Sequence, residues 1–187
     1  MTAIAHIETA RLLLRAPHPD DAPVFFEIHG DPGTNRFNPA GAMTRERADA
    51  AIASDIGHWT RHGYGYWAVA RRDDPVAVIG FGGLALRDFG GTQRANLGFR
   101  FATPTWGRGY ATELGAAALE AGWSLLMLAE IWASARENHP ASLAVLARIG
   151  MTAVERVADP REGVAASVWH VARRPGTSSA AADGAAG

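Results

Sequence analysis

The segment PTWGRGYATE, residues 104–113, stands between a predicted strand that ends at Ala102 and a predicted helix from Gly107 to Leu126. Gly107 and Gly109 let the backbone turn sharply and approach a ligand closely. The first amides of a helix have no partners within it, and the helix dipole adds partial positive charge there. Arg108 adds a full charge, so the turn predicts a pyrophosphate site. The same pattern also occurs in purely structural loops, so further features must decide.

Hydrophobic periodicity on either side of this turn predicts a chain of mixed helices and strands. Alternation with a period of two from Tyr64 onward indicates three successive strands with short turns, which form an antiparallel meander. Apolar residues at helical spacing indicate helices before and after it. An α/β or α+β fold follows, with a mixed sheet and helices on both faces. The predicted strands are residues 11–15, 64–71, 76–86, 94–102, 130–136, 152–157 and 165–172, and the predicted helices are 20–29, 44–62, 107–126 and 140–149.

The composition excludes several classes of chemistry. The 187 residues carry 18 basic and 19 acidic side chains, a formal net charge of −1, and this balance argues against a dedicated nucleic-acid binder. All 18 basic residues are arginine, so the chain has no Schiff-base lysine and no phosphate-loop lysine. It also has no cysteine, which excludes a thiolate nucleophile, a thiolate metal site and a disulfide.

The length predicts a single domain, residues 1–174, followed by a disordered tail at 175–187. The tail, PGTSSAAADGAAG, has only small or polar side chains, which cannot offset the entropy of ordering. The N-terminal residues lack the apolar stretch of a signal peptide, and charges interrupt every candidate membrane span. We therefore expect a cytoplasmic protein without a membrane partner.

A second informative stretch is ENHPAS, residues 137–142, which opens the helix after the next predicted strand. Together with PTWGRGYATE and the opening TARLLLR at residues 9–15, it resembles the GNAT N-acetyltransferase superfamily, in particular its RimJ/RimL-like branch. The resemblance covers roughly residues 8–174. It implies a GNAT-like fold whose mostly antiparallel central sheet contains one splayed parallel pair, here Phe99 to Phe101 against Ile131 to Ser134.

The resemblance implies acetyl-CoA as cosubstrate and no metal. Family members bind its pyrophosphate at the turn, and its pantetheine arm satisfies unpaired backbone groups of the splayed strands. Trp106 replaces a Gln or Arg that is common in this motif, and Asn138 stands one residue farther from Ser142 than usual. The implied cofactor-binding residues are Phe99, Arg100, Phe101, Trp106, Gly107, Arg108, Gly109, Tyr110, Ala111, Thr112, Asn138 and Ser142.

The implied reaction is direct attack of a primary amine on the thioester in a ternary complex. Many relatives have a Glu base in the run E-x-G-Y, where this chain reads Asn96-Leu97-Gly98-Phe99. Asparagine cannot accept a proton at neutral pH, so we expect Asn96 to orient a water that relays the proton to Asp88 or another carboxylate, unless the amine arrives neutral. Relatives often use a Tyr after the second motif as the proton donor to the leaving thiolate. Because no Tyr follows Tyr110 in this chain, the resemblance leaves Ser142 as the expected donor.

The acceptor is predicted to be a protein N-terminus or a small amine, bound by a monomer or a homodimer. Phe37 and Trp59 are the candidate lining of its pocket. Acidic residues nearby, among them Asp49 and Asp55, would attract a cationic amine, although charges on helices are usually only solvated. Asn96 and the missing C-terminal Tyr also fit a second class of function, an acyl-CoA-binding sensor without turnover.

Two other patterns in the chain are typical of different functions. GFGGLA at residues 80–85 approaches the dinucleotide-binding fingerprint, but no helix follows it, so close packing or a bulge explains its glycines better. His58 and His62 have a metal-ligand spacing on one helix, but no third ligand is evident. We interpret them as histidines at a solvated helix end, and His139 as a helix cap.

Overall fold

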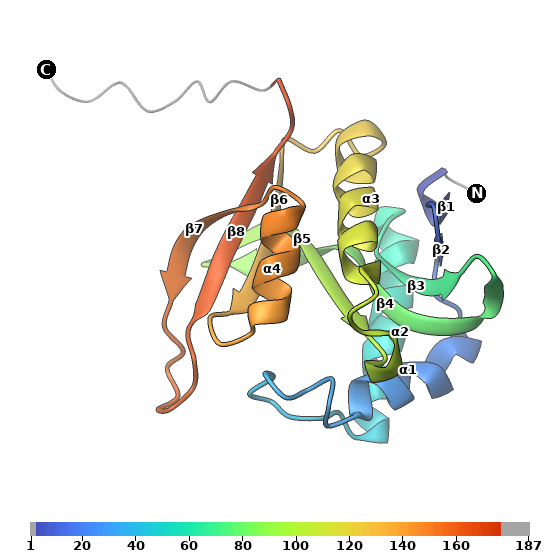
Figure 1. The fold of residues 1–187 in the computed structure, drawn as a ribbon, viewed down its shortest axis with the longest axis horizontal. Coiled ribbons are helices and arrows are strands. Elements are labelled where there is room, and N and C mark those ends of the chain that lie inside the picture. Colours follow the sequence, from blue (N-terminus) through green and yellow to red (C-terminus); the bar gives the residue numbers. More distant parts are fainter. Residues whose placement is uncertain (1–2, 177–187) are drawn as a thin grey trace, which may run out of the picture.

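The computed structural model describes residues 3–176, which form one eight-stranded sheet with helices on both faces (Figure 1). The strands lie side by side in the order β1-β2-β3-β4-β5-β6-β8-β7. The strands are β1 (His6–Glu8), β2 (Leu12–Arg15), β3 (Tyr66–Arg71), β4 (Asp74–Phe89), β5 (Thr92–Phe101), β6 (Glu130–Arg136), β7 (Thr152–Val157) and β8 (Ser167–Arg173). The helices are α1 (Ala22–Gly30), α2 (Arg45–His62), α3 (Tyr110–Ser124) and α4 (Pro140–Arg148), with short 3-10 turns at Ala3–Ala5, Pro19–Asp21 and Thr103–Thr105.

The sheet is antiparallel at every strand pair except β5 and β6. All of β5 pairs with the second part of β4, from Gly80 opposite Phe101 to Phe89 opposite Thr92. β5 and β6 pair at a single position, Asn96 opposite Trp132, and then diverge (Figure 1). The predicted fold class, with its splayed parallel pair, is therefore confirmed. We call the two diverging segments, β5 after Asn96 and β6 after Trp132, the open strand pair.

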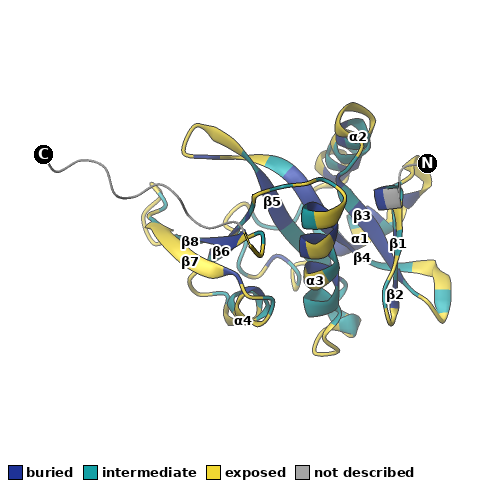
Figure 2. Ribbon diagram, turned by 90° about the horizontal axis from the view of Figure 1, so that it is seen from above, coloured by how far each residue is buried: buried dark blue, intermediate teal, exposed yellow. Residues whose placement is uncertain are grey.

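Successive residues of β3 and β4 face opposite sides of the sheet, and each side is covered by different helices. Ala68 and Phe81, which are directly opposite each other, pack with Phe25 of α1 and Ile52 of α2. The other side packs against α3, where a Cβ added at Gly82 would lie 2.6 Å from the Leu114 side chain. In Figure 2 the buried strands β3, β4 and β5 lie between α2 and α3.

The glycine run at residues 80–85 serves close packing, as the sequence suggested. A Cβ at Gly80 would lie 2.6 Å from the Phe101 ring, and one at Gly83 would lie 2.6 Å from Trp67. Both distances are shorter than van der Waals contact allows, so only glycine fits at these positions.

Several boundaries differ from the sequence-based expectation for identifiable reasons. β1 was not predicted, because three residues give too little periodicity to detect. α3 begins at Tyr110 rather than at Gly107, since Gly107 and Gly109 both have positive φ. β4 is longer than residues 76–86, because the turn that precedes it occupies Arg72 and Asp73.

His58 does not lie at a solvated helix end. It is buried in α2 with 8% of its surface exposed. Its Nδ1 donates to the Tyr64 carbonyl at 2.8 Å, and its Nε2 accepts from the Leu86 amide at 3.1 Å. The expectation was wrong for His58 because its ring faces the sheet, where it links α2 to β4 through the Leu86 amide. Burial lowers the pKa of His58, in keeping with a neutral ring.

The predicted tail begins with an exposed turn at Pro175 and Gly176, and from residue 177 it lies outside the described residues. None of the helices within residues 3–176 is both long and apolar enough to cross a membrane.

Burial of His29 gives the fold a measurable pH dependence. Its ring stacks on Phe25 with centroids 3.8 Å apart. Burial, with the Arg100 charge as a lesser cause, lowers the pKa of His29 from 6.5 to about 4. The stability that the neutral ring contributes is therefore present above pH 6.5 and is lost as the pH falls towards 4. At pH 5 the loss is about 2 kcal/mol, or roughly 5 °C in melting temperature for a chain of this size.

We expect His29→Phe, which keeps the stacking, to remove this part of the pH dependence. The measurement is thermal unfolding of both proteins at about pH 7.5 and about pH 5. His6→Gln, at an exposed histidine, is the control and should keep the wild-type slope. Equal slopes for wild type and His29→Phe would show that another group carries the effect.

Candidate active site

An exposed turn, residues 106–109, leads from β5 into α3. Gly107 and Gly109 have φ of 73° and 78°, the left-handed region that favours glycine. The amides of residues 107–112 donate to no group that the structure describes, and the first helical bond runs from the Glu113 amide to the Gly109 carbonyl at 3.1 Å. With the exposed Arg108 beside them, these amides have the geometry and charge that an anion requires.

Arg11 holds this turn against the start of β2. Its Nη1 donates to the Arg108 carbonyl at 2.9 Å, and its Nε donates to Glu113 at 2.7 Å. The Arg11 amide and the Thr9 hydroxyl donate to the same carboxylate at 2.7 and 2.6 Å. Burial alone would raise the pKa of Glu113, but these hydrogen bonds outweigh it and hold the pKa below its ordinary value. We call Thr9, Arg11 and Glu113 the clamp.

The open strand pair begins at Asn96, where β5, the strand that precedes the turn, separates from β6. Phe99 and Phe101 face the α3 side, and Phe101 stacks against Tyr110 with ring centroids 6.5 Å apart. The Trp106 indole donates to the Phe101 carbonyl at 2.8 Å, so this tryptophan fixes where β5 ends. After Asn96 the edge of β5 that faces β6 has no ladder partner, which leaves backbone groups for an extended ligand.

Arg100 points to the opposite face from Phe99 and Phe101. It lies opposite Phe81, on the α1 and α2 side, and donates to the buried Asn35. Burial lowers its pKa. Arg100 is one of the predicted cofactor-binding residues. Its backbone, and not its guanidinium, therefore borders the space between β5 and β6.

Asn96 meets a residue that the sequence did not single out, Tyr66. The Asn96 amide donates to Tyr66 Oη at 2.9 Å. A Cβ at Gly98 would lie 2.8 Å from that oxygen, so the glycine makes room for the hydroxyl. The phenol therefore lies over β5 just where the open strand pair begins. No local pattern indicates this contact, because it depends on the register of three strands.

His139 caps α4, as expected, because its Nδ1 accepts from the Ser142 amide at 3.3 Å. Its ring lies 4.3 Å from that of Phe37, which belongs to the loop between α1 and α2. Asn138 is exposed, and Ser142 is half-buried. The structure thus brings Phe37, Asn138 and Ser142 to one end of the open strand pair.

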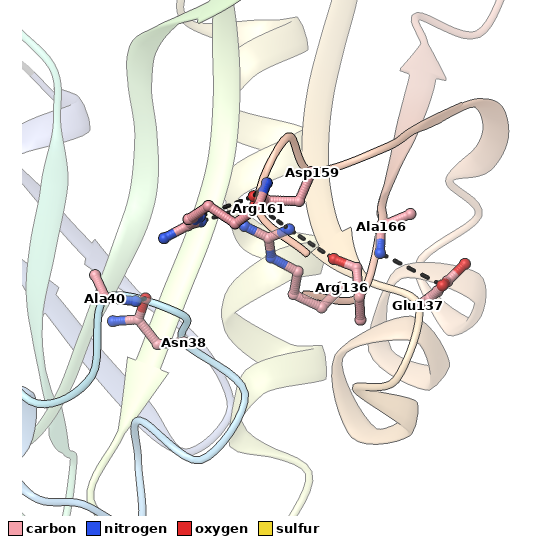
Figure 3. Close-up of polar contacts among 8 residues, drawn as sticks. Asn38, Ala40, Arg136, Glu137, Asp159, Arg161 and Ala166 are labelled. Atoms are coloured by element: carbon pink, nitrogen blue, oxygen red, sulfur yellow. Dashed lines mark hydrogen bonds and ion pairs between the residues drawn. The ribbon is translucent and has the colours of Figure 1, made fainter. Parts of the chain in front are cut away.

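A cavity of about 170 Å³ lies beside these residues, lined by Arg36, Phe37, Asn38, Pro39, Arg136, Asn138, Gly163, Val164 and Ala165. Figure 3 shows Arg136 and Arg161 directed towards Asp159, near the loop that carries Asn38. The two guanidiniums lie 3.0 and 2.7 Å from Asp159. Hydrogen bonds from Arg161, with Arg136 contributing, hold the pKa of Asp159 well below its usual range. This network orders the loop that forms one wall of the cavity.

Trp59, a predicted lining residue of the acceptor pocket, and Asp88, the predicted carboxylate of the proton relay and the third predicted substrate-binding residue, lie elsewhere. The Trp59 indole donates to the Tyr66 carbonyl at 2.8 Å, and its ring packs against Gly65. It fills the space between α2 and β3 and does not join Phe37. Asp88 is exposed at the turn between β4 and β5, where it accepts from the Gly91 amide at 3.1 Å. It is paired with Gln93, three positions from Asn96 on β5, and it faces the other side of the sheet, so a relay from Asn96 to Asp88 is not supported.

No group of three or more His, Asp or Glu side chains within residues 3–176 has a metal-binding arrangement.

The clamp generates a stability prediction. We expect Glu113→Gln to lower stability by about 1–3 kcal/mol near neutral pH, because a largely buried carboxylate with charged partners is lost. Since the pKa of Glu113 is lowered in the fold, its contribution is present above pH 4.5 and shrinks as the pH falls. Urea unfolding at several pH values measures this. Glu120→Gln, at an exposed position of α3, is the control and should not change the free energy of unfolding. Equal stability of the two variants would show that the clamp contributes nothing to the stability of the fold.

Comparison with known proteins agrees with the geometry. Residues 11–152 match the family model of the acetyltransferase (GNAT) domain. The uncharacterized N-acetyltransferase YnaD of Bacillus subtilis is 27% identical over 146 residues, which cover 78% of this chain and 82% of YnaD. An acetyltransferase from Agrobacterium tumefaciens has a similar structure, with a TM-score of 0.76, 21% identity and coverage of 93% of this chain and 97% of that one.

A further structural neighbour is the spermidine N-acetyltransferase from Vibrio cholerae in complex with CoA and spermine. Its TM-score is 0.70 at 15% identity, and the match covers 88% of this chain and 96% of that one. At such identities the two solved structures show the fold alone. The family match, in contrast, spans most of the chain. This protein therefore belongs to the GNAT acetyltransferase family and is an acyltransferase.

Proposed function

We propose that the protein is a RimJ/RimL-like, cytoplasmic N-acetyltransferase that moves an acetyl group from acetyl-CoA to a primary amine. The observation that carries the proposal is the row of unpartnered amides at residues 107–112, placed beside a strand pair that opens after Asn96. An anion site alone would fit many ligands. An anion site next to an unpaired strand edge fits a ligand with a phosphate group at one end and an extended amide chain at the other.

The residues present fit acetyl-CoA. The amides of residues 107–112 and Arg108 would hold its pyrophosphate, and the backbone of Phe99 to Phe101 would hold its pantetheine arm. Asn138 follows the end of β6 and Ser142 lies in the first turn of α4, where they would contact the same arm. When bound, acetyl-CoA supplies an acetyl group activated as a thioester.

The chain itself contributes placement and polarity. The clamp fixes the turn, so little loop ordering remains to be done on binding. A backbone N–H near Phe99 or Arg100 would polarise the thioester carbonyl. The half-buried Ser142 remains the candidate proton donor to the sulfur.

The acceptor amine would enter from the side of the loop between α1 and α2, where Phe37 borders the cavity. A small amine and a protein N-terminus both present a primary amine, and the spermidine N-acetyltransferase named above acts on a small one. The protein would work as a monomer or homodimer, without nucleic acid or a membrane.

We expect Gly109→Pro to raise the Kd for CoA at least tenfold. Proline cannot adopt the φ of 78° found at Gly109, and it removes one of the donors. Calorimetry with the folded variant measures the affinity. Gly63→Ala places a side chain at another glycine of positive φ, at the end of α2, and should leave the Kd unchanged. Unchanged affinity in Gly109→Pro would move the cofactor site elsewhere.

Turnover separates an enzyme from a sensor of the same fold. We expect thiol release from acetyl-CoA that depends on an added amine, with acetylation of that amine visible by mass spectrometry. A panel of polyamines, amino acids and N-terminal peptides serves as acceptors. Tight CoA binding without thiol release for any acceptor would instead favour the acyl-CoA-binding sensor.

A further inference from the structure

The cavity beside Phe37 carries positive charge that the reaction described so far does not use. Two of its lining side chains, Arg36 and Arg136, are guanidiniums, and none of the described residues that line it is acidic. The other polar side chains of the lining are the amides of Asn38 and Asn138. Guanidinium and amide groups donate hydrogen bonds, so this lining suits an anion that accepts them.

The carboxylates beside the cavity are already bound by other arginines. Asp159 lies 3.0 Å from Arg136 and 2.7 Å from Arg161, and its side chain is only 6% exposed (Figure 3). Glu137, directly after β6, lies 2.7 Å from Arg156. Two guanidiniums share the single negative charge of Asp159, which leaves one positive charge over at this wall of the cavity.

Arg36 adds a guanidinium that has no carboxylate partner. Within residues 3–176 its side chain makes no ion pair, and it lies over the Phe37 ring, 5.4 Å from the centroid. This contact with the ring orients the guanidinium. Glu162, an acidic residue of the loop between β7 and β8, is exposed and does not line the cavity. Arg36 can therefore bind an added anion without first breaking an ion pair.

Arg100 lies one side chain behind the cavity wall, and among the described residues it too has no carboxylate partner. Its guanidinium donates to Asn35 Oδ1, and the Asn38 side-chain amide donates to the same oxygen at 3.0 Å. Burial lowers the pKa of Arg100, because a half-buried charge without a counter-ion is poorly solvated. An anion in the cavity would offset part of this cost.

The loop that carries Arg36 is ordered by its own hydrogen bonds. The Asn35 amide donates to the His29 carbonyl at 2.7 Å, and the Asn38 amide donates to the Gly41 carbonyl at 3.0 Å. These bonds fix the two ends of the segment that borders the cavity. Little loop entropy would therefore be lost when a ligand binds there.

We propose that this cavity binds a carboxylate of the acceptor, so that the acceptor is a free amino acid and not a polyamine. This rests on the proposed N-acetyltransferase function. Arg36 would form the direct ion pair, and Arg136 and Arg100 would add positive potential. The cavity of about 170 Å³ is slightly larger than the roughly 150 Å³ that holds benzene in an engineered protein core, so a carboxylate with a few carbon atoms fits.

Asn138 connects this cavity to the proposed cofactor site. It lines the cavity, and it follows β6, one of the two diverging strands. A carboxylate held at Arg36 thus leaves the amine end of a short molecule free to reach towards the open strand pair. The nitrogen forms its bond to the acetyl carbon and the C–S bond breaks. Of the two protons that the ammonium loses, one ends on the sulfur and one in solvent, while the carboxylate is unchanged.

The first test compares amines that differ only in the carboxylate. Alanine is paired with alaninamide, and 4-aminobutyrate with butylamine, and spermidine is included as a cationic acceptor. We expect kcat/KM from thiol release to be at least about tenfold higher for the better amino acid than for its partner, because a charge-assisted hydrogen bond is lost without the carboxylate. Equal values within both pairs, or a preference for spermidine, would overturn this inference and leave the N-acetyltransferase function standing.

The second test changes Arg36 in the full chain. Arg36→Gln should raise KM for the amino acid about tenfold or more, with a smaller effect on kcat, and leave kcat/KM for the matched amine unchanged. Arg36→Lys should keep part of the preference, and Arg36→Glu should shift it towards spermidine. Arg61→Gln removes the same charge at an exposed position in the last turn of α2 and should match wild type. An unchanged KM in Arg36→Gln would overturn the assignment.

Affinity for CoA distinguishes the acceptor from the cofactor as the source of the anion. The Kd for CoA should be the same in Arg36→Gln and wild type. A clear rise would assign the cavity to a phosphate of the cofactor and overturn the proposal. Peptides that begin with Asp or Asn provide the other source of a carboxylate. A higher kcat/KM for the Asp peptide than for every free amino acid would overturn the choice of a free amino acid.

A last readout does not depend on turnover. The better amino acid, added to the CoA-saturated protein, should raise the melting temperature, whereas its partner without the carboxylate should not. High salt should weaken this shift, because it screens the exposed Arg36 charge, and Arg36→Gln should abolish it. A shift that persists in Arg36→Gln would overturn the inference. No thiol release with any amine would overturn the proposed function, and the acceptor assignment with it.

Discussion

The active-site architecture depends on one interrupted hydrogen-bond ladder. β5 is paired to β4 along its length, so it cannot bend away from that neighbour, and its contact with β6 ends at Asn96 opposite Trp132. The parting of β5 and β6 exposes a strand edge inside the fold. It also sends the end of β5 towards the turn at residues 106–109, where α3 begins with unpartnered amides. The unpaired strand edge and the turn with unpartnered amides thus follow one another along the chain, one on β5 and the other directly after it.

Contacts from both the N-terminal and the C-terminal part of the chain hold the two diverging strands in place. The clamp ties the start of α3 to the connection between β1 and β2 through Arg11 and Glu113, about a hundred residues apart in sequence. Trp106 fixes the last carbonyl of β5. On the other side, Arg136 and Arg161 bind Asp159 and order the loop near the end of β6. Opened strands that were not held in this way would pair or collapse, because unpaired backbone groups are costly.

The sequence predicted the elements whose signals are local. The turn at residues 106–109, the helices and the meander follow from glycine placement and periodicity, and the family resemblance added the splayed strands. Tyr66 and His58 could not be placed in this way, because their partners, Asn96 and Leu86, lie on other strands and are set by register. The position of Trp59 in the chain alone predicts a place in the acceptor pocket. In the structure its indole N–H donates to the Tyr66 carbonyl, so the ring packs between α2 and β3 instead.

Asp55 shows how such a signal is overlooked. The same apolar stripe that predicted α2 passes through residue 55, so a carboxylate there is a local conflict with the fold. A charge on a helix is usually solvated, and the conflict was interpreted in that way. In the structure Asp55 is half-buried on the sheet-facing side of α2, and this burial raises its pKa to about 6. The turn with the unpartnered amides leads into α3 on one face of the sheet, while Tyr66 and Asn96 meet on the α1 and α2 face. Asn96, whose side chain meets Tyr66 on the α1 and α2 face, is also the residue at which β5 leaves β6, so the opening between the strands begins next to both faces of the sheet.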